Sequence, residues 1–171
     1  MSESFKNLSQ DMLIEILHDF AANWLAHDGA WFLAAEKEYG LEKAIFLDRE
    51  AWREFSPVEA RRIMKRHGIA AGGGLNALKK ALGLRMYALL NKQKITEETP
   101  GSFIFKMVDC RVQSARRRKN LPDFPCKSVG VVEYAEFAKA IDPRIKCECI
   151  ACPPDEVERD YFCAWKFSLG E

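Results

Sequence analysis

The stretch Ile145-Lys146-Cys147-Glu148-Cys149-Ile150-Ala151-Cys152-Pro153-Pro154 decides how the last third of the chain folds. Residues 145–150 have the composition of a short β-strand, and the two prolines after Cys152 prevent the strand from continuing. A second strand is predicted over 161–167, because apolar side chains there alternate along the chain and share one face. The alternating residues are Tyr161, Cys163, Trp165 and Phe167. The sequence therefore predicts a hairpin whose turn carries Cys152.

Four cysteines in this part of the chain follow the pattern C-x22-C-x2-C-x10-C, which suits a metal site. Tetrahedral zinc and iron sites commonly take two thiolates from one tight turn and two from separate elements. Cys149 and Cys152 can form the close pair, although no glycine lies between them as in the usual metal-binding turn. We predict a zinc site, with iron as the alternative metal, on Cys126, Cys149, Cys152 and Cys163. Buried free thiols are the simpler explanation, because cysteine is among the most buried residue types.

The length and composition of the chain indicate one domain. A chain of 171 residues with 48% hydrophobic content can bury a single core. We predict one domain over 1–171, with a helical half over 1–91 and an α+β half over 92–171 that carries the cysteine cluster. The net charge of +1 gives no general preference for nucleic acid or membrane.

The predicted location is the cytoplasm. Residues 1–11 lack the features of a secretory signal, and no apolar stretch has the length of a membrane span. The cytosol keeps thiols reduced, so six cysteines favour metal binding or thiol chemistry over a disulfide framework. No membrane partner is expected.

The first half of the chain has helical periodicity. A helix is predicted from an N-cap at Ser9, with an interruption at Gly29 and an end at Gly40. A second helix is predicted over 41–55. Ser56-Pro57-Val58-Glu59 then combines a capping box with proline at the first helical position, which predicts a separate helix up to His67.

A glycine-rich joint over 70–74 and one more amphipathic helix over 75–89 complete the helical half. The glycines lack the flanking Lys-Ser/Thr or spaced glycines of a nucleotide-binding loop. The pattern changes after residue 92: strands are predicted over 94–97 and 102–108, on either side of a Pro100-Gly101 turn. A basic helix or loop over 111–119 and a helix over 128–140 follow.

These elements predict an α+β fold in which an N-terminal helical layer packs on an antiparallel sheet. The sheet is built from two β-hairpins joined by helices. The basic cluster over 116–119 could bind phosphates, but no aromatic residues are interleaved with it, so a solvated surface is favoured and a nucleic-acid partner is not expected.

Aromatic residues are abundant enough to suggest a ligand pocket between the helices and the sheet. The inner face of the sheet should offer Phe103, Phe105, Trp165 and Phe167. The predicted ligand-binding residues of the helical half are Trp24, His27, Trp31, Glu36 and Trp52. We expect a cavity of a few hundred Å³ that takes a small, mainly apolar or aromatic molecule. Core packing alone is the alternative explanation for these aromatic side chains.

The C-terminal half resembles a known small-molecule-binding family, the 4-vinyl reductase domain. The likeness rests on Cys126-Lys127-Ser128-Val129-Gly130 at the start of a helix, the pair Cys149 and Cys152, and Cys163 with an aromatic residue two positions later. The family also forms the aromatic-sensing domains of some bacterial regulators, whose metal ligands are Cys, Glu, Cys and Cys. The resemblance implies that Cys149 replaces the glutamate here. The segment between Cys152 and Cys163 is longer than in those sensors, which leaves the ligand set open.

The chain is still more similar to an uncharacterised, cysteine-rich prokaryotic domain family, which in turn resembles the 2-aminothiazoline-4-carboxylate hydrolases. This likeness runs through Asp109-Cys110-Arg111, residues 121–126, Ile141-Asp142-Pro143-Arg144, Cys152-Pro153-Pro154 and residues 161–165.

Two classes of function follow from the sequence. The first is a zinc-stabilised, sensor-like binding domain, with a homodimer as a further possibility. The second is an enzyme: a hydrolase of a small heterocycle that uses a metal or Cys110, or an iron-binding or redox protein that uses the same cysteines. Four thiolates leave no open position on zinc, which favours the first class. A cysteine nucleophile would need a histidine, and His18, His27 and His67 all lie in the helical half.

Overall fold

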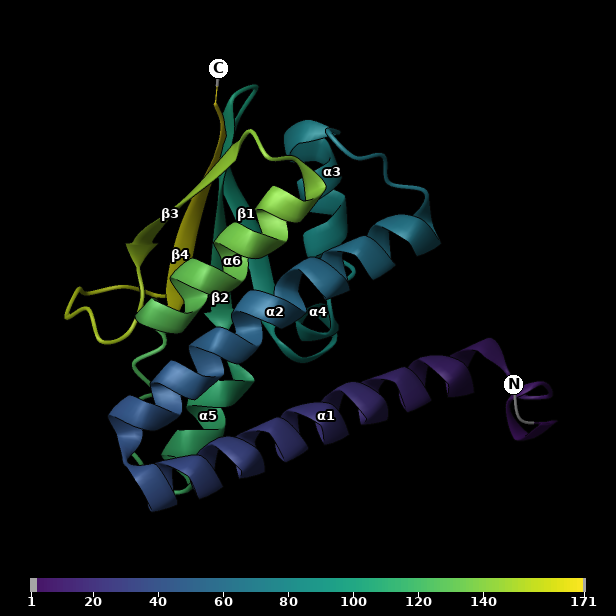
Figure 1. Ribbon diagram of the computed structural model, residues 1–171. Helices are drawn as coiled ribbons and strands as arrows, with labels where there is room; N and C mark the ends of the chain where they lie inside the picture. Colours follow the sequence, from purple (N-terminus) through teal and green to yellow (C-terminus); the bar gives the residue numbers. More distant parts are fainter. Residues whose placement is uncertain (1–2, 171) are drawn as a thin grey trace.

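The computed structural model describes residues 3–170 (Figure 1), so residues 1, 2 and 171 of the predicted domain lie outside the described part. The helices are η1 (Glu3–Phe5, a 3-10 turn), α1 (Gln10–Tyr39), α2 (Leu41–His67), α3 (Gly74–Leu82), α4 (Met86–Leu90), α5 (Arg111–Arg118) and α6 (Lys127–Ile141). The strands are β1 (Lys92–Thr99), β2 (Ser102–Asp109), β3 (Ile145–Ala151) and β4 (Cys163–Leu169).

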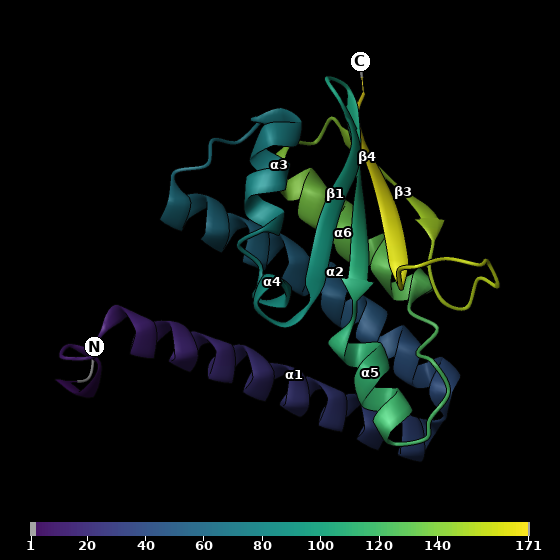
Figure 2. The ribbon, with the colours of Figure 1, turned by 180° about the vertical axis from the view of Figure 1, so that it is seen from behind.

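The four strands form one antiparallel sheet in the order β1-β2-β4-β3. Helix α6 lies across one face of this sheet and packs extensively against α2 (Figure 1). The view from behind shows the opposite face of the sheet without a helix over it (Figure 2). The predicted α+β class, with a helical layer on an antiparallel sheet, is confirmed.

The inner face of the sheet is built by period-two alternation, as expected. Phe103 pairs with Phe167, and Phe105 pairs with Trp165, in the register between β2 and β4. All four side chains are almost fully buried. Strand β4 begins at Cys163, two residues later than predicted, so Tyr161 lies outside it. The aromatic inner face that the sequence predicted is confirmed.

The ends of α1 lie where the sequence places them. The hydroxyl of Ser9 accepts a hydrogen bond from the backbone N–H of Met12 at 3.2 Å, and Gly40 ends the helix with a φ of 81°. The interruption predicted at Gly29 is wrong, because α1 continues through it. One glycine costs a helix about 1 kcal/mol, and the packing of Trp24 and Phe32 on either side holds the helix in place.

Helix α2 is also longer than predicted, because it continues through Pro57. The helix start predicted at Ser56 is therefore wrong. The Ser56 hydroxyl donates to the carbonyl oxygen of Trp52 at 2.7 Å instead of capping a new helix. Buried side chains on both sides of the proline, including Trp52 and Ala60, lie on the face that packs against α6. Tertiary packing thus outweighs the loss of one backbone hydrogen bond.

The glycine-rich joint is tied to the rest of the fold. Gly72 donates its backbone N–H to the carbonyl oxygen of Ile141 at 2.9 Å, and Gly74 donates to Asp142 Oδ2 at 3.0 Å. Both glycines have positive φ values, 73° and 64°, which other residues rarely adopt. The single helix predicted over 75–89 is wrong, since α3 ends at Leu82 and α4 begins four residues later.

The buried side chains form two clusters. The larger one lies between the sheet, α3 and α6, and the smaller one centres on Trp52, Phe124 and Val129 beneath α1 and α2. Within residues 3–170, no helix combines the length and the apolar character that crossing a membrane would require.

Candidate functional site: an acid-lined cavity with a thiol cluster

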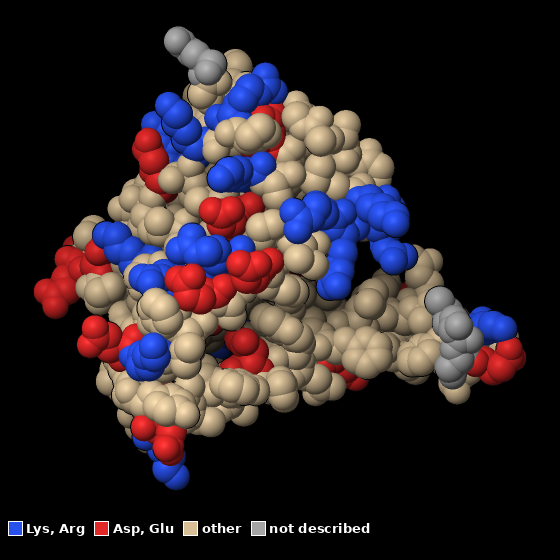
Figure 3. All heavy atoms as spheres, viewed as in Figure 1, with Lys and Arg blue, Asp and Glu red and all other residues tan. Residues whose placement is uncertain are grey.

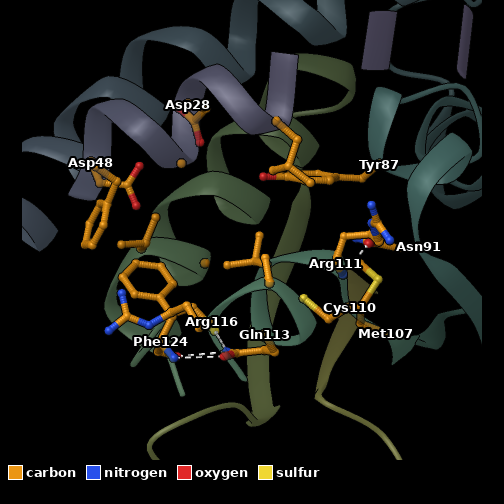
Figure 4. Close-up of a pocket in the computed structure, with 18 of the residues that line it drawn as sticks. Asp28, Asp48, Tyr87, Asn91, Met107, Cys110, Arg111, Gln113, Arg116 and Phe124 are labelled. Atoms are coloured by element: carbon orange, nitrogen blue, oxygen red, sulfur yellow. Dashed lines mark hydrogen bonds between the residues drawn. The ribbon is translucent and has the colours of Figure 1, made fainter. Parts of the chain in front are cut away.

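A cavity of about 370 Å³ lies where α1, α2, α5 and α6 meet the ends of β2 and β4. Phe32, Trp52, Phe124, Val129 and Trp165 supply much of its apolar wall. Figure 4 shows the labelled side chains surrounding the space from several elements. The cavity has the size that the sequence suggested for a ligand pocket, but of the aromatic residues expected from the sheet only Trp165 lines it. Phe103, Phe105 and Phe167 belong to the larger buried cluster instead.

Close packing between Gly130 and Trp165 shapes one wall of this cavity. A Cβ atom on Gly130 would lie 2.6 Å from Cζ2 and 2.8 Å from Cη2 of the Trp165 ring. Only glycine therefore lets α6 approach the ring this closely. The Trp165 ring also meets Tyr134, one helical turn further along α6, with ring centroids 4.9 Å apart. The glycine thus lets Trp165 pack under α6 at the cavity wall.

Two carboxylates enter the cavity from the helical layer, Asp28 from α1 and Asp48 from α2. They lie on the same side of the space in Figure 4. Burial, with the neighbouring charges of Asp28 and Glu133, raises the pKa of Asp48 to about 7, and a hydrogen bond from Trp52 opposes this rise. Burial also raises the pKa of Asp28. In the space-filling view, acidic atoms lie in a recess beside α1 (Figure 3).

Glu133 on α6 is a third carboxylate in the cavity wall, and it shares a buried arginine with Glu59. Arg85 Nη2 lies 2.7 Å from Glu133 Oε1, and Arg85 Nε donates to Glu59 Oε2 at 2.9 Å. Arg85 is only 2% exposed. Burial raises the pKa of Glu133, although the charge of Arg85 opposes that rise. One guanidinium thus serves two buried carboxylates.

The opposite wall comes from α5, whose polar side chains are engaged within the protein. Gln113 and the backbone of Phe124 exchange two hydrogen bonds, at 2.9 and 2.8 Å. Arg116 Nη1 donates to Glu36 Oε2 at 3.0 Å, and Arg116 Nε donates to the carbonyl oxygen of Pro122 at 2.7 Å. These bonds fix the loop after α5 against α1.

Three thiols meet at the sheet side of the cavity. Cys126 Sγ lies 3.4 Å from Cys152 Sγ, and Cys152 also forms a side-chain hydrogen bond with Cys163. The indole N–H of Trp165 donates to Cys163 Sγ at 3.3 Å. We call Cys126, Cys152 and Cys163 the thiol cluster, and Cys110 lines the same cavity.

Cys149, the fourth predicted metal ligand, lies outside the cavity wall that contains the thiol cluster. It is half-buried on β3, opposite Trp165 in the register. Burial raises its pKa to about 11, and the nearby ammonium group of Lys127 opposes this rise. Among residues 3–170, no set of three or more histidine, cysteine or acidic side chains has the arrangement of a metal site. The zinc site therefore stays a prediction.

The predicted ligand-binding residues occupy three different environments. Trp52 lines the cavity, and Trp24 packs behind it with ring centroids 6.1 Å apart. His27 and Trp31 lie at a shallow surface hollow on α1, where Trp31 is 67% exposed. Glu36 contacts Arg116 instead of the cavity space. Only Trp52 is thus placed directly at the cavity.

Asp48 and Glu133 are parts of the site that were not predicted from the sequence. Asp48 precedes Trp52 by one helical turn, so it shares the inward face of α2, and that spacing could have identified it. Glu133 stands beside Tyr134 on the inward side of α6, but its role depends on Arg85 from a distant segment. No local pattern predicts that contact.

Comparisons with known proteins identify a family and one structural likeness. No curated protein matches the chain. A solved structure of a trafficking protein particle complex subunit 3 from Naegleria fowleri, covalently bound to palmitic acid, is similar with a TM-score of 0.49 and 8% sequence identity. That match covers 95% of this chain and 98% of the other. A family model described as a family of unknown function (DUF6125) matches residues 6–169. The chain therefore belongs to the DUF6125 family.

Proposed function

We propose that this protein is a small-molecule-binding domain whose ligand occupies the cavity between the helical layer and the sheet. The observation that carries the proposal is the cavity itself, about 370 Å³ in volume and walled largely by apolar side chains. Ligand pockets commonly have volumes of about 300–1,000 Å³ and a few polar groups among apolar ones. The three carboxylates and the thiol cluster supply such polar groups.

The cavity is partly open to solvent, so water can enter it. An organic ligand that displaces this water from the aromatic wall gains about 25 cal/mol for each Å² of apolar surface that it buries. The carboxylates of Asp28 and Asp48 can accept hydrogen bonds from water, and the aromatic wall favours an organic ligand.

The proposal includes a structural zinc ion bound by the thiol cluster and Cys149, with iron as the alternative. Two thiolates on a tetrahedral zinc ion with bonds of about 2.3 Å lie roughly 3.8 Å apart. The distance of 3.4 Å between Cys126 Sγ and Cys152 Sγ is close to that spacing. Cys149 lies near enough to interact electrostatically with Cys126 and Cys163, so its thiolate could complete the set. In the resemblance to the 4-vinyl reductase sensors, Cys149 stands at the position of their glutamate ligand and the other three cysteines at the positions of their cysteine ligands.

The hydrolase and redox alternatives gain less support. Burial raises the pKa of Cys110 to about 12, which keeps the thiol protonated and weakly nucleophilic at neutral pH. His27 lies at an exposed hollow whose lining does not include Cys110. We also propose a cytoplasmic location, because the six cysteines are free thiols and that compartment keeps thiols reduced.

We propose further that two copies of the chain associate through the outer face of α1. Leu13, Leu17, Phe20 and Trp31 share one side of the helix, and each is between 37% and 67% exposed. The exposed apolar residues of α1 also include Met12, Ile14 and Tyr39. In a symmetric dimer, the apolar face of α1 in each copy would cover the same face of α1 in the other copy.

The binding proposal is tested by titration with N-phenyl-1-naphthylamine, a neutral apolar dye that fluoresces in dry surroundings. We expect saturable binding of one dye per chain and quenching of tryptophan emission, since Trp52 and Trp165 line the cavity. The Leu17→Glu variant is the control, because Leu17 is 53% exposed on α1 and remote from the cavity lining. It should bind the dye equally well.

The same variant tests self-association. Sedimentation should show a dimer for the parent chain and a monomer for Leu17→Glu. A dye that fails to saturate, or that loses its site in Leu17→Glu, would contradict the cavity as a binding site. A parent chain that stays monomeric at high concentration would contradict the dimer alone.

A further inference from the structure

We infer that the ligand of this cavity carries a protonated nitrogen, which binds between Asp28 and Asp48 while an apolar body lies against the aromatic wall. The inference rests on the proposed small-molecule function and adds the chemical class of the ligand. Primary and secondary amines and amidines attached to a small aromatic or aliphatic group belong to that class.

The acidic and basic residues of the cavity lining lie on different walls, with the basic ones all on or just after α5. Asp28, Asp48 and Glu133 line the space from α1, α2 and α6. The only partner of Glu133 in an ion pair among residues 3–170 is Arg85, which also serves Glu59. Two buried carboxylates therefore already share one positive charge, and Arg85 forms no ion pair with either aspartate.

Neither aspartate takes part in an ion pair in the described part of the chain, although the neighbouring His27 opposes the rise that burial causes in the pKa of Asp28. Asp48 accepts a hydrogen bond from Trp52 but takes part in no ion pair. Asp28 forms neither a hydrogen bond nor an ion pair within residues 3–170. Moving a carboxylate from water into a protein interior costs free energy unless a positively charged group lies beside it. A ligand cation would supply that group.

The aromatic rings beside the aspartates favour the same ligand. Trp52 and Tyr87 line the cavity and stack on each other, with ring centroids 5.8 Å apart. The faces of such rings attract positive charge, and the Arg85 guanidinium already lies over both, 5.7 Å from each ring centroid. Aromatic side chains also pack against the apolar part of a ligand, and this contact needs no hydrogen-bonding group on that part. The wall therefore suits a molecule with one cationic end.

The basic residues of the wall do not balance the aspartates. Arg116 is engaged by Glu36 and by the carbonyl oxygen of Pro122. Arg111, Arg118 and Lys119 are exposed to solvent. They lie on or just after α5, whereas the aspartates belong to α1 and α2. An acidic ligand could contact these exposed side chains at the surface. Within the cavity it would lie beside the carboxylates of Asp28 and Asp48, which would repel it.

Three probes that share one apolar body test the inference: 2-phenylethylamine, 2-phenylethanol and phenylacetate. Each is titrated at pH 8 against the protein loaded with N-phenyl-1-naphthylamine. We expect the amine to displace the dye at a concentration at least about tenfold lower than the alcohol, and phenylacetate to be weakest. Asp28→Asn and Asp48→Asn should each remove most of the advantage of the amine over the alcohol.

Asp19→Asn is the matched control, since it removes the same charge from an exposed position on α1. It should leave all three displacement curves unchanged. The ligand class would be overturned if the amine and the alcohol displaced the dye equally, or if the advantage of the amine survived in both cavity variants. The proposed binding function would still stand in that case, because the dye binds. Failure of the dye itself to bind would overturn both.

Discussion

Cys126 Sγ lies 3.4 Å from Cys152 Sγ, although 25 residues separate the two cysteines in the sequence. The helix start that carries Cys126 and the turn that carries Cys152 are joined by a second contact, in which the backbone N–H of Lys127 donates to the carbonyl oxygen of Pro153 at 2.9 Å. Lys127 Nζ also lies 2.8 Å from Asp155 Oδ1. Contacts outside the thiols themselves thus hold Cys126 and Cys152 side by side.

The first prediction concerns metal content. Elemental analysis of protein purified without a histidine tag should find about one zinc or iron ion per chain, and a strong chelator should lower the melting temperature. Cys152→Ser should lose the metal, because Cys152 touches both other members of the thiol cluster. Cys147→Ser should retain it. Metal-free parent protein would disprove the site.

The second prediction concerns the pH dependence of stability through Asp48. Its pKa is about 7 in the folded protein and 3.8 without the fold, because burial and the charges of Asp28 and Glu133 favour the protonated acid. The ionisation of Asp48 therefore lowers stability progressively as pH rises from about 4 to 7. The loss is constant above pH 7 and reaches up to about 4 kcal/mol.

Asp48→Asn removes this loss and keeps an acceptor for the Trp52 indole. At pH 8 we expect the variant to have a free energy of unfolding in urea about 2–4 kcal/mol higher than that of the parent. Near pH 4 the two free energies should be equal. The ionisable neighbours that face Asp48 are Asp28 on α1, Glu133 on α6 and Tyr87 on α4. They stay the same in both proteins, so the difference between the two curves isolates Asp48. A constant difference across this pH range would refute the assignment.

The third prediction concerns the buried arginine. Arg85→Met leaves Glu59 and Glu133 without their shared guanidinium, so the free energy of unfolding should fall by about 3–5 kcal/mol. Arg117→Gln breaks an exposed pair with Asp123 and should cost less than about 1 kcal/mol. Adding Glu133→Gln to Arg85→Met should recover part of the loss. Similar losses for Arg85→Met and Arg117→Gln in urea denaturation would contradict the buried pair.

The fourth prediction compares two helical glycines. Gly130→Ala places a methyl group within 2.8 Å of the Trp165 ring and should destabilise the protein by about 1–3 kcal/mol, despite the better helix propensity of alanine. Gly29→Ala meets no atom within 4 Å and should stabilise the protein by about 1 kcal/mol. Opposite signs in thermal denaturation are expected. A stabilising Gly130→Ala would show that the ring is not packed there.

Features that depend on neighbouring residues could be predicted from the sequence. The cap at Ser9, the end at Gly40 and the inner face of the sheet follow from local hydrogen bonds and from period-two alternation. The helix start predicted at Ser56-Pro57 is wrong, because this capping signature lies inside α2. The helix continues there because the surrounding side chains pack against α6. Local preference was overruled there by contacts with a segment about 70 residues away.

The candidate site shows the same limit. Trp52 could be predicted as a cavity residue from its place among aromatic side chains. Trp31 has the same character but points outward, since its side of α1 has no partner within the described chain. Glu133 gains its importance from Arg85, and Asp48 gains its own from the charges of Asp28 and Glu133. Such a network depends on three helices at once, so spacing along one helix cannot reveal it.

The central claim is that the cavity binds a small molecule, and filling the cavity from α1 tests it most directly. Gly29 lines the cavity, and a Cβ atom there would meet nothing within 4 Å, so Gly29→Leu can occupy the space without disturbing the fold. Ala30→Leu is the control, since Ala30 lies at the outer hollow of the same helix.

The measurement is the affinity for N-phenyl-1-naphthylamine in the parent chain and in both variants, together with their melting temperatures. We predict that Gly29→Leu melts no lower than the parent and loses at least about tenfold in affinity, whereas Ala30→Leu binds like the parent. Undiminished dye binding in a folded Gly29→Leu would contradict the account.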